Sequence, residues 1–466
     1  MKVLLTHGYF IKEDLLEQKI MKPYPPLGIL YLSSYLTQHG IDNKIFDSTF
    51  SSKENLKNYL LKEKPEYIAI YVNLMTKLNV LEIIGFIKSQ NDLKNSKIIL
   101  GGPEVRYNAD DLLKHGADCI VIGEGEQTLL ELLETLDSKK LEDLSKVKGI
   151  GYINFDGAVF TPERNLINRL DDLPLPNREG IKVKDYQDAW KARHNQDAVS
   201  ISTMRGCPYT CRWCSRAVYG LSYRRRSAKK VVEELRAVKE SYNPDTIWFV
   251  DDVFTVSHLW LNEFNDELKK QSIKINYECI TRSDRMNEEV LRLMKESGCF
   301  RVWIGAESGS QRVIDAMDRR INVNQMREMI KLTKKKGIEA GTFIMLGYPG
   351  ETEKDIEETI THLKKSNPDH FTITVAYPIK GTEFYQEVEA KQIGEFQWEK
   401  QTDRERDFKR TYPRKYYNYA VQRVHSEFNY YKLKSENHLL SIPALKFKIK
   451  SVLAKARMQL EKAKSN

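Results

Sequence analysis

Three cysteines stand close together near the middle of the chain and are the clearest candidates for chemistry. The segment RGCPYTCRWCS, residues 205–215, holds Cys207, Cys211 and Cys214, half of the six cysteines. Structural zinc needs four closed ligands, and the nearest histidine, His194, lies beyond a predicted strand. A redox Cys-x-x-Cys pair would leave Cys207 unused. A 4Fe–4S cluster normally takes four thiolates, so three leave one iron open to a substrate or cofactor, and this spacing favours such a cluster.

The bulk composition indicates a reduced, globular protein of two or three domains. The 466 residues are too many for one core, and no apolar run reaches the length of a membrane span. The N-terminus has no export signal, so a cytoplasmic location is expected. The net charge of +9 comes from residues 401–466, which carry 16 Lys+Arg and 6 Asp+Glu. The remaining 400 residues are close to neutral, which does not favour nucleic-acid binding.

The first 137 residues alternate apolar runs with amphipathic helical patterns. Five such runs predict βαβ units and a doubly wound, Rossmann-like parallel sheet with its ligand beyond the carboxyl ends of the strands. Two glycine-rich loops follow these strands, where the backbone can approach a ligand closely. They contain Gly101, Gly102, Pro103 and Glu104 in one loop, and Gly123 and Glu124 in the other. Tight turns between strand and helix explain these loops equally well.

A second strand–helix series follows a connector. Residues 138–197 form the connector, with a hairpin signal at Asp156–Gly157. Six apolar runs between residues 198 and 385 predict six strand–helix units, a partial TIM barrel open on one side. Residues 386–466 are basic and rich in tyrosine, and we expect a mostly helical region there. The domain prediction is therefore 1–137, 138–197, 198–385 and 386–466.

With Trp213 just before the last cysteine, the segment resembles the radical S-adenosylmethionine (SAM) enzymes. In that family the open iron chelates SAM, the reduced cluster passes an electron to the sulfonium, and a 5′-deoxyadenosyl radical abstracts hydrogen from a substrate. The resemblance implies a 4Fe–4S cluster on Cys207, Cys211 and Cys214, with SAM as cosubstrate. It leaves the catalytic side chains unknown.

The resemblance also implies SAM contacts at the predicted strand tips. They are Trp213, Asp251, Asp252, Arg282, Glu307, Ser308, Leu346 and Gly347. The family's Gly-Gly-Glu is absent at FVDD, residues 249–252, which puts the role of the two aspartates in doubt. A solvated carboxylate explains Glu307 equally well, and the YPG segment is turn chemistry whatever its function.

The order of the two predicted domains is similar to the cobalamin-binding subfamily of radical SAM enzymes. This resemblance covers residues 1–385 and implies cobalamin contacts at the two glycine-rich loops and at Pro26, Leu27 and Gly28 of YPPLGILYLSSYL. A proline-capped helix start explains the latter segment unaided. The motif Asp-x-His-x-x-Gly is absent, because His7, His39 and His115 have other neighbours. Cobalt held without a histidine and a loss of cobalamin both remain open.

The function implied is a cobalamin-dependent methyltransferase acting on an unactivated carbon of a small molecule or lipid. Alternatives are an oxidative cyclisation or rearrangement, as in the anaerobic porphyrin-ring cyclase branch, and a non-catalytic iron–sulfur scaffold or sensor. The methylthiotransferase branch needs N-terminal cysteines, but the first here is Cys119. The expected partners are the substrate and an electron donor such as flavodoxin or ferredoxin.

Two basic segments have open interpretations. RRRS, residues 224–227, could line a pocket for an acidic or aromatic compound together with the tyrosines of residues 409–431, or it could form a solvated face. Residues 445–462 combine a basic face with Leu445, Phe447, Ile449, Val452 and Leu453, which is compatible with peripheral membrane contact.

Overall fold

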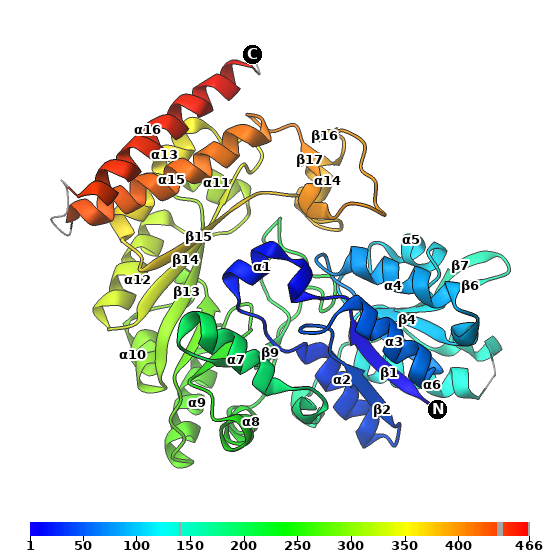
Figure 1. Ribbon diagram of the computed structural model, residues 1–466. Helices are drawn as coiled ribbons and strands as arrows, with labels where there is room; N and C mark the ends of the chain where they lie inside the picture. The colour runs from blue at the N-terminus through cyan, green and yellow to red at the C-terminus, as the bar shows by residue number, and fades with distance from the viewer. Residues whose placement is uncertain (139–140, 436–440, 465–466) are drawn as a thin grey trace. The chain divides into compact units, whose positions relative to one another are not determined.

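The computed structural model describes residues 1–138, 141–435 and 441–464 (Figure 1). The chain divides into two compact units. The first comprises Met1–Pro208, Arg216–Trp248 and Gln397–Thr402, and the second comprises Tyr209–Ser215, Phe249–Phe396 and Asp403–Asn466.

The first unit is built on a seven-stranded sheet of order β2-β1-β3-β4-β5-β6-β7. Its five parallel strands are β1 (Val3–His7), β2 (Asn43–Phe46), β3 (Tyr67–Tyr71), β4 (Lys97–Gly101) and β5 (Cys119–Val121). The order confirms the doubly wound prediction and places the switch point between β1 and β3. The Asp156–Gly157 hairpin forms β6 (Ile150–Asn154) and β7 (Gly157–Phe160), and β6 extends this sheet antiparallel to β5.

Helices cover both faces of this sheet. Helices α2 (Leu27–Gln38) and α6 (Gly125–Asp137) bury leucines and isoleucines on one face. Helices α3 (Lys53–Glu63), α4 (Lys77–Ser89) and α5 (Ala109–Lys114) bury theirs on the other. Successive side chains of a strand point to opposite faces of the sheet, and helices cover both faces. Side chains on both faces are therefore apolar, which is why the sequence shows unbroken apolar runs. The short α1 (Leu15–Ile20) and the connector helix α7 (Val183–His194) complete the helices of this region.

The second series of strands forms a six-stranded sheet of order β15-β14-β13-β12-β11-β8. The strands are β8 (Ala198–Ile201), β11 (Thr246–Phe249), β12 (Tyr277–Thr281), β13 (Cys299–Glu307), β14 (Glu339–Leu346) and β15 (His370–Val375). The pairs from β12 to β15 are parallel. Two short strands, β9 (Met204–Arg205) and β10 (Arg224–Arg225), flank the cysteine segment. The strands agree with the six predicted apolar runs.

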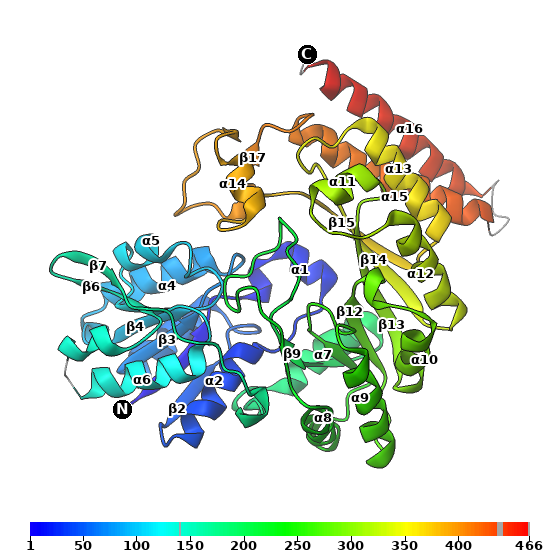
Figure 2. The same ribbon diagram turned by 180° about the vertical axis from the view of Figure 1, so that it is seen from behind.

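Helices follow most of these strands. They are α8 (Ala228–Tyr242), α9 (His258–Lys270), α10 (Glu288–Glu296), α11 (Gln311–Ala316), α12 (Val323–Lys335) and α13 (Glu353–Ser366). Figure 2 shows α10 and α12 alongside β13 and β14. Polar caps set their starts: Asn287 accepts from Val290 N, and Thr352 forms a capping box with Asp355. These caps fix where each strand-to-helix loop ends.

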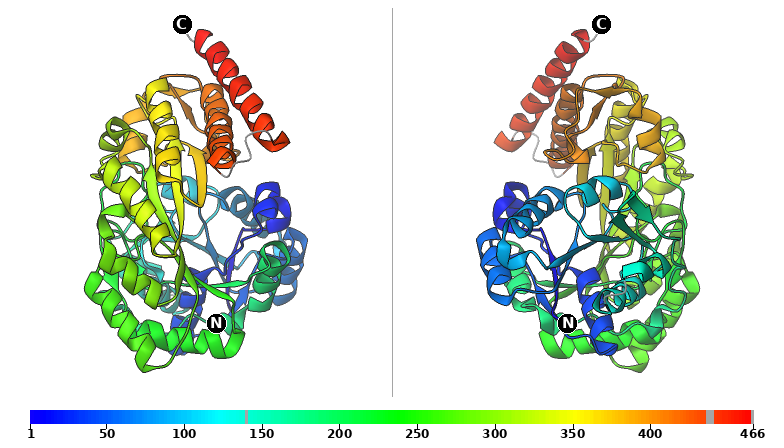
Figure 3. Two further views of the ribbon diagram at one scale, coloured as in Figure 1. Left: turned by 90° about the vertical axis from the view of Figure 1, so that its left-hand side faces the viewer. Right: turned by 90° about the vertical axis from the view of Figure 1, so that its right-hand side faces the viewer.

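The C-terminal region is mainly helical, as expected. It contains α14 (Glu383–Glu389), the two-residue strands β16 (Gln392–Ile393) and β17 (Asp407–Phe408), and two long helices, α15 (Arg414–Ser435) and α16 (Ile442–Ala463). Figures 1 and 3 show α16 packed along α15. None of the described helices combines the length and apolar character that a membrane crossing requires.

Candidate functional site

The cysteine segment begins in a loop that is closed at its base by two short strands. β9 pairs with β10, with Arg205 opposite Arg224 and Met204 opposite Arg225. The next residue, Gly206, has a φ of 80°, and a Cβ there would lie 2.5 Å from Ser222 O. Only glycine fits this position, because any side chain would be both strained and overlapped. Cys207 follows this fixed turn directly.

Two buried arginines join this loop base to the second glycine-rich loop. Arg205 donates to Glu124 Oε1 at 2.7 Å and also to Glu126, while Arg224 donates to Glu124 Oε2 at 2.6 Å. Glu124 is the N-cap residue of α6 and also accepts from Ile167 N. Its preceding residue, Gly123, has a φ of 90°. The Glu124 carboxylate is thus already bound by protein groups, and its predicted role toward cobalamin stays a prediction.

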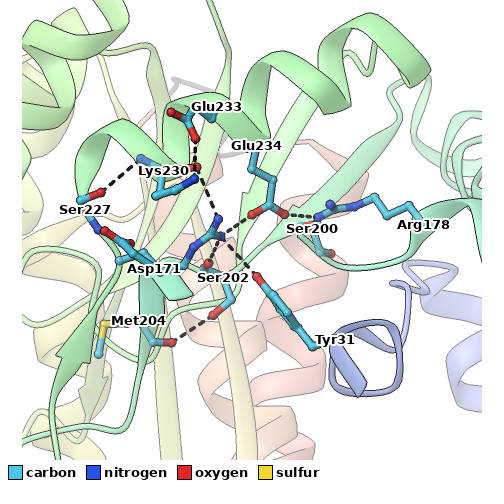
Figure 4. Close-up of polar contacts among 11 residues, drawn as sticks. Tyr31, Asp171, Arg178, Ser200, Ser202, Met204, Ser227, Lys230, Glu233 and Glu234 are labelled. Atoms are coloured by element: carbon cyan, nitrogen blue, oxygen red, sulfur yellow. Dashed lines mark hydrogen bonds and ion pairs between the residues drawn. The ribbon is translucent and has the colours of Figure 1, made fainter. Parts of the chain in front are cut away.

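A second buried ion cluster supports the strand that leads into the loop (Figure 4). Glu234 of α8 accepts from Arg178 at 2.6 Å and from Arg226, which also donates to Tyr31 Oη at 3.2 Å. Arg178 donates in addition to Ser200 O of β8 at 2.9 Å. Burial opposes ionisation of Glu234, but the two guanidinium groups hold its pKa below the ordinary value. Arg224 and Arg226 of RRRS therefore lie in buried ion pairs, and do not form a solvated face.

The second part of the cysteine segment, Tyr209–Ser215, is anchored within the other unit. Thr210 donates to Asp318 Oδ2 at 2.8 Å, and Arg212 N donates to Met317 O at 3.2 Å. Phe384 N at the start of α14 donates to Arg212 O at 3.0 Å. Cys214 N donates to Cys211 O, which forms a tight turn between the two cysteines. The backbone here is held by the turn after α11 and by α14.

Two buried arginines converge on the thiol of Cys211. Arg282 Nη1 and Arg319 Nη1 each lie 3.7 Å from Cys211 Sγ, within the range of an N–H···S hydrogen bond. Arg282 is fixed by two bonds to Asp284, by a bond to Arg319 O and by the ring of Tyr209, 3.8 Å away. Arg319 donates to Gly305 O at 2.6 Å and lies over the ring of Trp213.

The backbone around these arginines adopts an unusual conformation. Glu307, Asp318 and Arg320 all have φ between 50° and 64°, which non-glycine residues rarely adopt. Such residues concentrate at functional sites, because a surrounding structure must hold them there. Glu307 ends β13, and Arg319 Nη1 lies 3.7 Å from its carboxylate. Burial raises the pKa of Glu307, while Arg319 and Arg282 oppose that rise.

Other predicted SAM contacts lie at the ends of strands in the same unit. Asp251 and Asp252 follow β11; burial, and secondarily Asp251, raises the pKa of Asp252. Ser308 is buried and its hydroxyl accepts from Ser310 N. Leu346 ends β14, and Gly347, with a φ of 81°, donates its N–H to Glu351. The structure thus places these residues at the carboxyl ends of β11, β13 and β14.

Arg319 and Glu351 have no predicted role in the sequence analysis. Arg319 belongs to no recognised motif, and its contact with Cys211 spans 108 residues. Glu351 lies in MLGYPGET, and its position directly after a turn glycine is the one local feature that could have marked it as a functional residue. It is fully buried, and burial raises its pKa to about 8. Tyr417 of α15 donates to Glu351 O at 2.8 Å.

The predicted cobalamin contacts of the first unit occupy loops at the carboxyl ends of strands and a helix start. Gly101 ends β4, and Gly102 has a φ of 111° with a hypothetical Cβ 2.5 Å from Val72 O, so the turn through Pro103 requires glycine. The buried Glu104 accepts from Asn108 at 3.0 Å. Pro26 is the N-cap residue of α2, Leu27 begins that helix, and the space beside Gly28 is open.

The three N-terminal histidines are engaged by protein groups. His7 ends β1 near the switch point; its Nε2 lies 3.0 Å from Asp47, and its Nδ1 accepts from Tyr9 N at 3.1 Å. His39 Nδ1 bonds to Tyr35 O, and His115 bonds through both nitrogens to Asp111 O and Glu399. Both nitrogens of His7 are thus occupied, so it could bind cobalt only by giving up one of these bonds.

The residues around Cys211 fit an iron–sulfur cluster. A buried cysteine sulfur that faces two guanidinium donors suits a group of net negative charge, and hydrogen bonds to sulfur are a known means of tuning iron–sulfur clusters. Among the described residues no three histidine, cysteine or acidic side chains are grouped closely enough to hold a single metal ion. A cubane cluster does not require this, because each thiolate binds a different iron.

Comparisons with known proteins agree with both halves of this description. Residues 201–363 match the radical SAM superfamily, and residues 17–133 match the B12-binding domain. The chain is 30% identical to an uncharacterized methyltransferase of Pyrococcus horikoshii, over 78% of each chain. It is 26% identical to the anaerobic magnesium-protoporphyrin IX monomethyl ester cyclase of Rubrivivax gelatinosus, over 86% of this chain and 72% of the relative. It is 27% identical to the hopanoid C-3 methylase of Methylococcus capsulatus, over 84% and 73%.

Solved structures share the fold. The cobalamin-dependent SAM radical enzyme OxsB, solved with aqua-cobalamin and SAM bound, matches with a TM-score of 0.75 at 19% identity, over 97% of this chain and 72% of that one. The radical SAM methyltransferase TsrM of Kitasatospora setae, solved with cobalamin and a [4Fe-4S] cluster, matches with a TM-score of 0.68 at 17% identity, over 83% and 74%. This chain belongs to the radical SAM superfamily, in the group whose members also carry a B12-binding domain.

Proposed function

We propose that the protein is a cobalamin-dependent radical SAM methyltransferase that acts on an unactivated carbon of a small molecule or lipid. The observation that carries the proposal is the environment of Cys211, where two buried arginines face one thiol of a three-cysteine segment. A B12-binding domain in the same chain supports the methyl-transfer reaction. The hopanoid methylase among the relatives favours a lipid or another small molecule as acceptor.

In this proposal Cys207, Cys211 and Cys214 hold the cluster and leave one iron for SAM. The bound groups supply a 5′-deoxyadenosyl radical from one SAM molecule and a methyl group carried by the corrin from another. The chain's own residues orient them. Arg282 and Arg319 fix the Cys211 side chain and offset negative charge, and Trp213 lies against Arg319.

The strand tips of the second unit receive SAM in this proposal. Glu307, whose carboxyl is buried beside Arg319, accepts hydrogen bonds from hydroxyl groups, and Ser308 holds the turn that follows. The N–H of Gly347 is bound to Glu351, which fixes the backbone of Leu346 and Gly347, and in this proposal that backbone contacts the adenine of SAM. Asp251 and Asp252 supply carboxylates for an amino group. Arg282, whose guanidinium is already bound to Asp284 and to Arg319 O, contacts SAM in this proposal from its place beside Cys211.

The cobalamin site is proposed at the carboxyl ends of β1, β3, β4 and β5, on the loops of Gly101–Glu104 and Gly123–Glu124 and at Pro26–Gly28. Because both nitrogens of His7 are engaged, we propose that the cobalt is held without a ligand from His7. The reducing electron is proposed to come from a small electron-transfer protein such as flavodoxin or ferredoxin. Peripheral contact with a membrane through the C-terminal region completes the proposal.

Oxidative cyclisation or rearrangement is the second candidate, because cyclases also occur among the relatives. SAM labelled with deuterium in its methyl group distinguishes the two. The anaerobically reconstituted and reduced protein is incubated with this SAM and with lipid and small-molecule extracts. Methyl transfer predicts S-adenosylhomocysteine in amounts comparable to 5′-deoxyadenosine and a product that gains the labelled methyl. Deoxyadenosine without S-adenosylhomocysteine and without label in any product would favour cyclisation or rearrangement.

A further inference from the structure

The C-terminal helix α16 has two apolar faces, and only one of them packs against the protein. Its inner face buries Ala444, Ser451, Ala454 and Met458. Ser451 donates to Glu427 of α15 at 2.5 Å, and Gln459 donates to Glu353 at 2.8 Å. These contacts fix the rotation of the helix about its own axis, so the side chains on the opposite face point away from the protein.

The outer face of α16 is apolar and exposed. Each of its large side chains keeps 51–83% of its surface accessible; they are Ile442, Leu445, Ile449, Val452, Leu453 and Leu460. At 100° per residue these positions fall on one stripe, opposite the buried row. Phe447, which the sequence alone grouped with them, is half-buried and lies on the inner side. Six exposed aliphatic side chains along one helix form an interaction surface.

Basic residues border this stripe on both sides. Lys446, Lys450 and Arg457 lie along one edge, and Lys448 and Lys455 lie along the other. Lys448 also lies 3.7 Å from Glu427, and the sixth basic residue, Lys462, turns inward and pairs with Glu353 at 3.1 Å. Residues 442–463 contain these six basic residues and a single acidic one, Glu461. If two copies packed stripe against stripe, like charges would meet along both edges, which opposes self-association. A flat anionic layer, in contrast, meets both basic edges and the apolar stripe at once.

We propose that the outer face of α16 docks on a membrane surface that carries anionic phospholipids. The helix lies in the plane of the interface, its aliphatic stripe enters the headgroup–acyl boundary, and its two basic edges contact lipid phosphates. This proposal is independent of the reaction that the protein catalyses.

Vesicle flotation of the full-length protein tests the proposal. Vesicles of phosphatidylcholine alone are compared with vesicles containing about one third phosphatidylglycerol. Wild type is expected to float with the anionic vesicles and to be released by high salt. Lys446→Gln with Lys450→Gln is expected to weaken partitioning onto the vesicles about 30-fold, because each lysine contributes about a factor of five. Ile449→Ser with Leu453→Ser is expected to weaken it by about the same factor or more.

A matched control makes the same kinds of change on another exposed helix. Leu259→Ser with Lys270→Gln on α9 removes one exposed leucine and one exposed lysine, and is expected to leave flotation unchanged. Absence of flotation with anionic vesicles would overturn the proposal. So would flotation that survives the Ile449→Ser/Leu453→Ser change, or a wild-type dimer that this change converts to monomer, which would assign the face to a second copy.

Discussion

Replacing Arg319 by glutamine should make the iron–sulfur cluster harder to reduce. The wild-type guanidinium lies 3.7 Å from Cys211 Sγ and is 6% exposed, so solvent screens its charge poorly. A nearby positive charge stabilises the reduced cluster more than the oxidised one, because reduction adds a negative charge. Removing it therefore lowers the midpoint potential.

The magnitude follows from the distance. At an effective dielectric constant of about 20, unit charges 3.7 Å apart interact by about 4 kcal/mol. The added electron is shared over the whole cluster, so we assign about one third of this energy, ~1.5 kcal/mol, to the pair. For a one-electron couple this corresponds to a shift of about 60 mV to lower potential.

Redox titration followed by electron paramagnetic resonance measures this shift without reference to turnover. Iron content is determined first, to establish that each variant retains its cluster. Arg319→Lys keeps the charge and should recover most of the potential. The matched control is Arg320→Gln, because Arg320 lies in the same turn but points to Asp318 and is exposed. Its shift should stay below about 15 mV, since solvent screens exposed charges. An unchanged or higher potential in Arg319→Gln would show that the Arg319 charge does not stabilise the reduced cluster.

Three further predictions concern stability. Burial raises the pKa of Glu351 from 4.5 to about 8, so the folded state retains a proton that the unfolded state loses. The free energy of unfolding should therefore fall by on the order of 3 kcal/mol as the pH rises from about 5 to 8. Thermal melts of Glu351→Gln should not show this fall. Glu234→Gln leaves two buried guanidinium groups without their carboxylate and should cost about 3–5 kcal/mol in chemical unfolding, whereas the adjacent, more exposed Glu233→Gln should cost under about 1 kcal/mol. Gly102→Ala should lower the melting temperature and weaken corrinoid binding, because the new Cβ would overlap Val72 O. The control is Gly85→Ala in the middle of α4, where the space is open, and it should leave the melting temperature unchanged or raise it. Equal effects within either matched pair would contradict the packing described.

The fold could be predicted because its strands are apolar on both faces. Runs such as residues 67–72 and 339–346 have no alternation, which is typical of parallel strands covered by helices. The Asp156–Gly157 turn predicted the hairpin, but its pairing with β5 depends on contacts that are distant in sequence. Local patterns specify elements, and long-range contacts specify which elements meet.

The same limit applies to the site. The cysteine spacing is local, and it identified the cluster segment. The arginines that face Cys211 could not be found in this way, because Arg319 lies 108 residues away and its motif-free turn carries no local signal. RRRS could be read as solvated or buried from composition alone. The ion pairs show that Arg224 and Arg226 are buried: Arg224 pairs with Glu124, 100 residues away, and Arg226 pairs with Glu234, two turns into the following helix.

Radical SAM chemistry in this protein is tested most directly by the amount of 5′-deoxyadenosine formed from SAM. The protein is reconstituted anaerobically with iron, sulfide and hydroxocobalamin, its iron and corrinoid contents are measured, and it is then reduced. Wild type should form 5′-deoxyadenosine and bind about one corrinoid per chain, and Cys211→Ala should form no 5′-deoxyadenosine. A preparation with a complete cluster that forms no 5′-deoxyadenosine would exclude radical cleavage of SAM and favour a non-catalytic iron–sulfur protein.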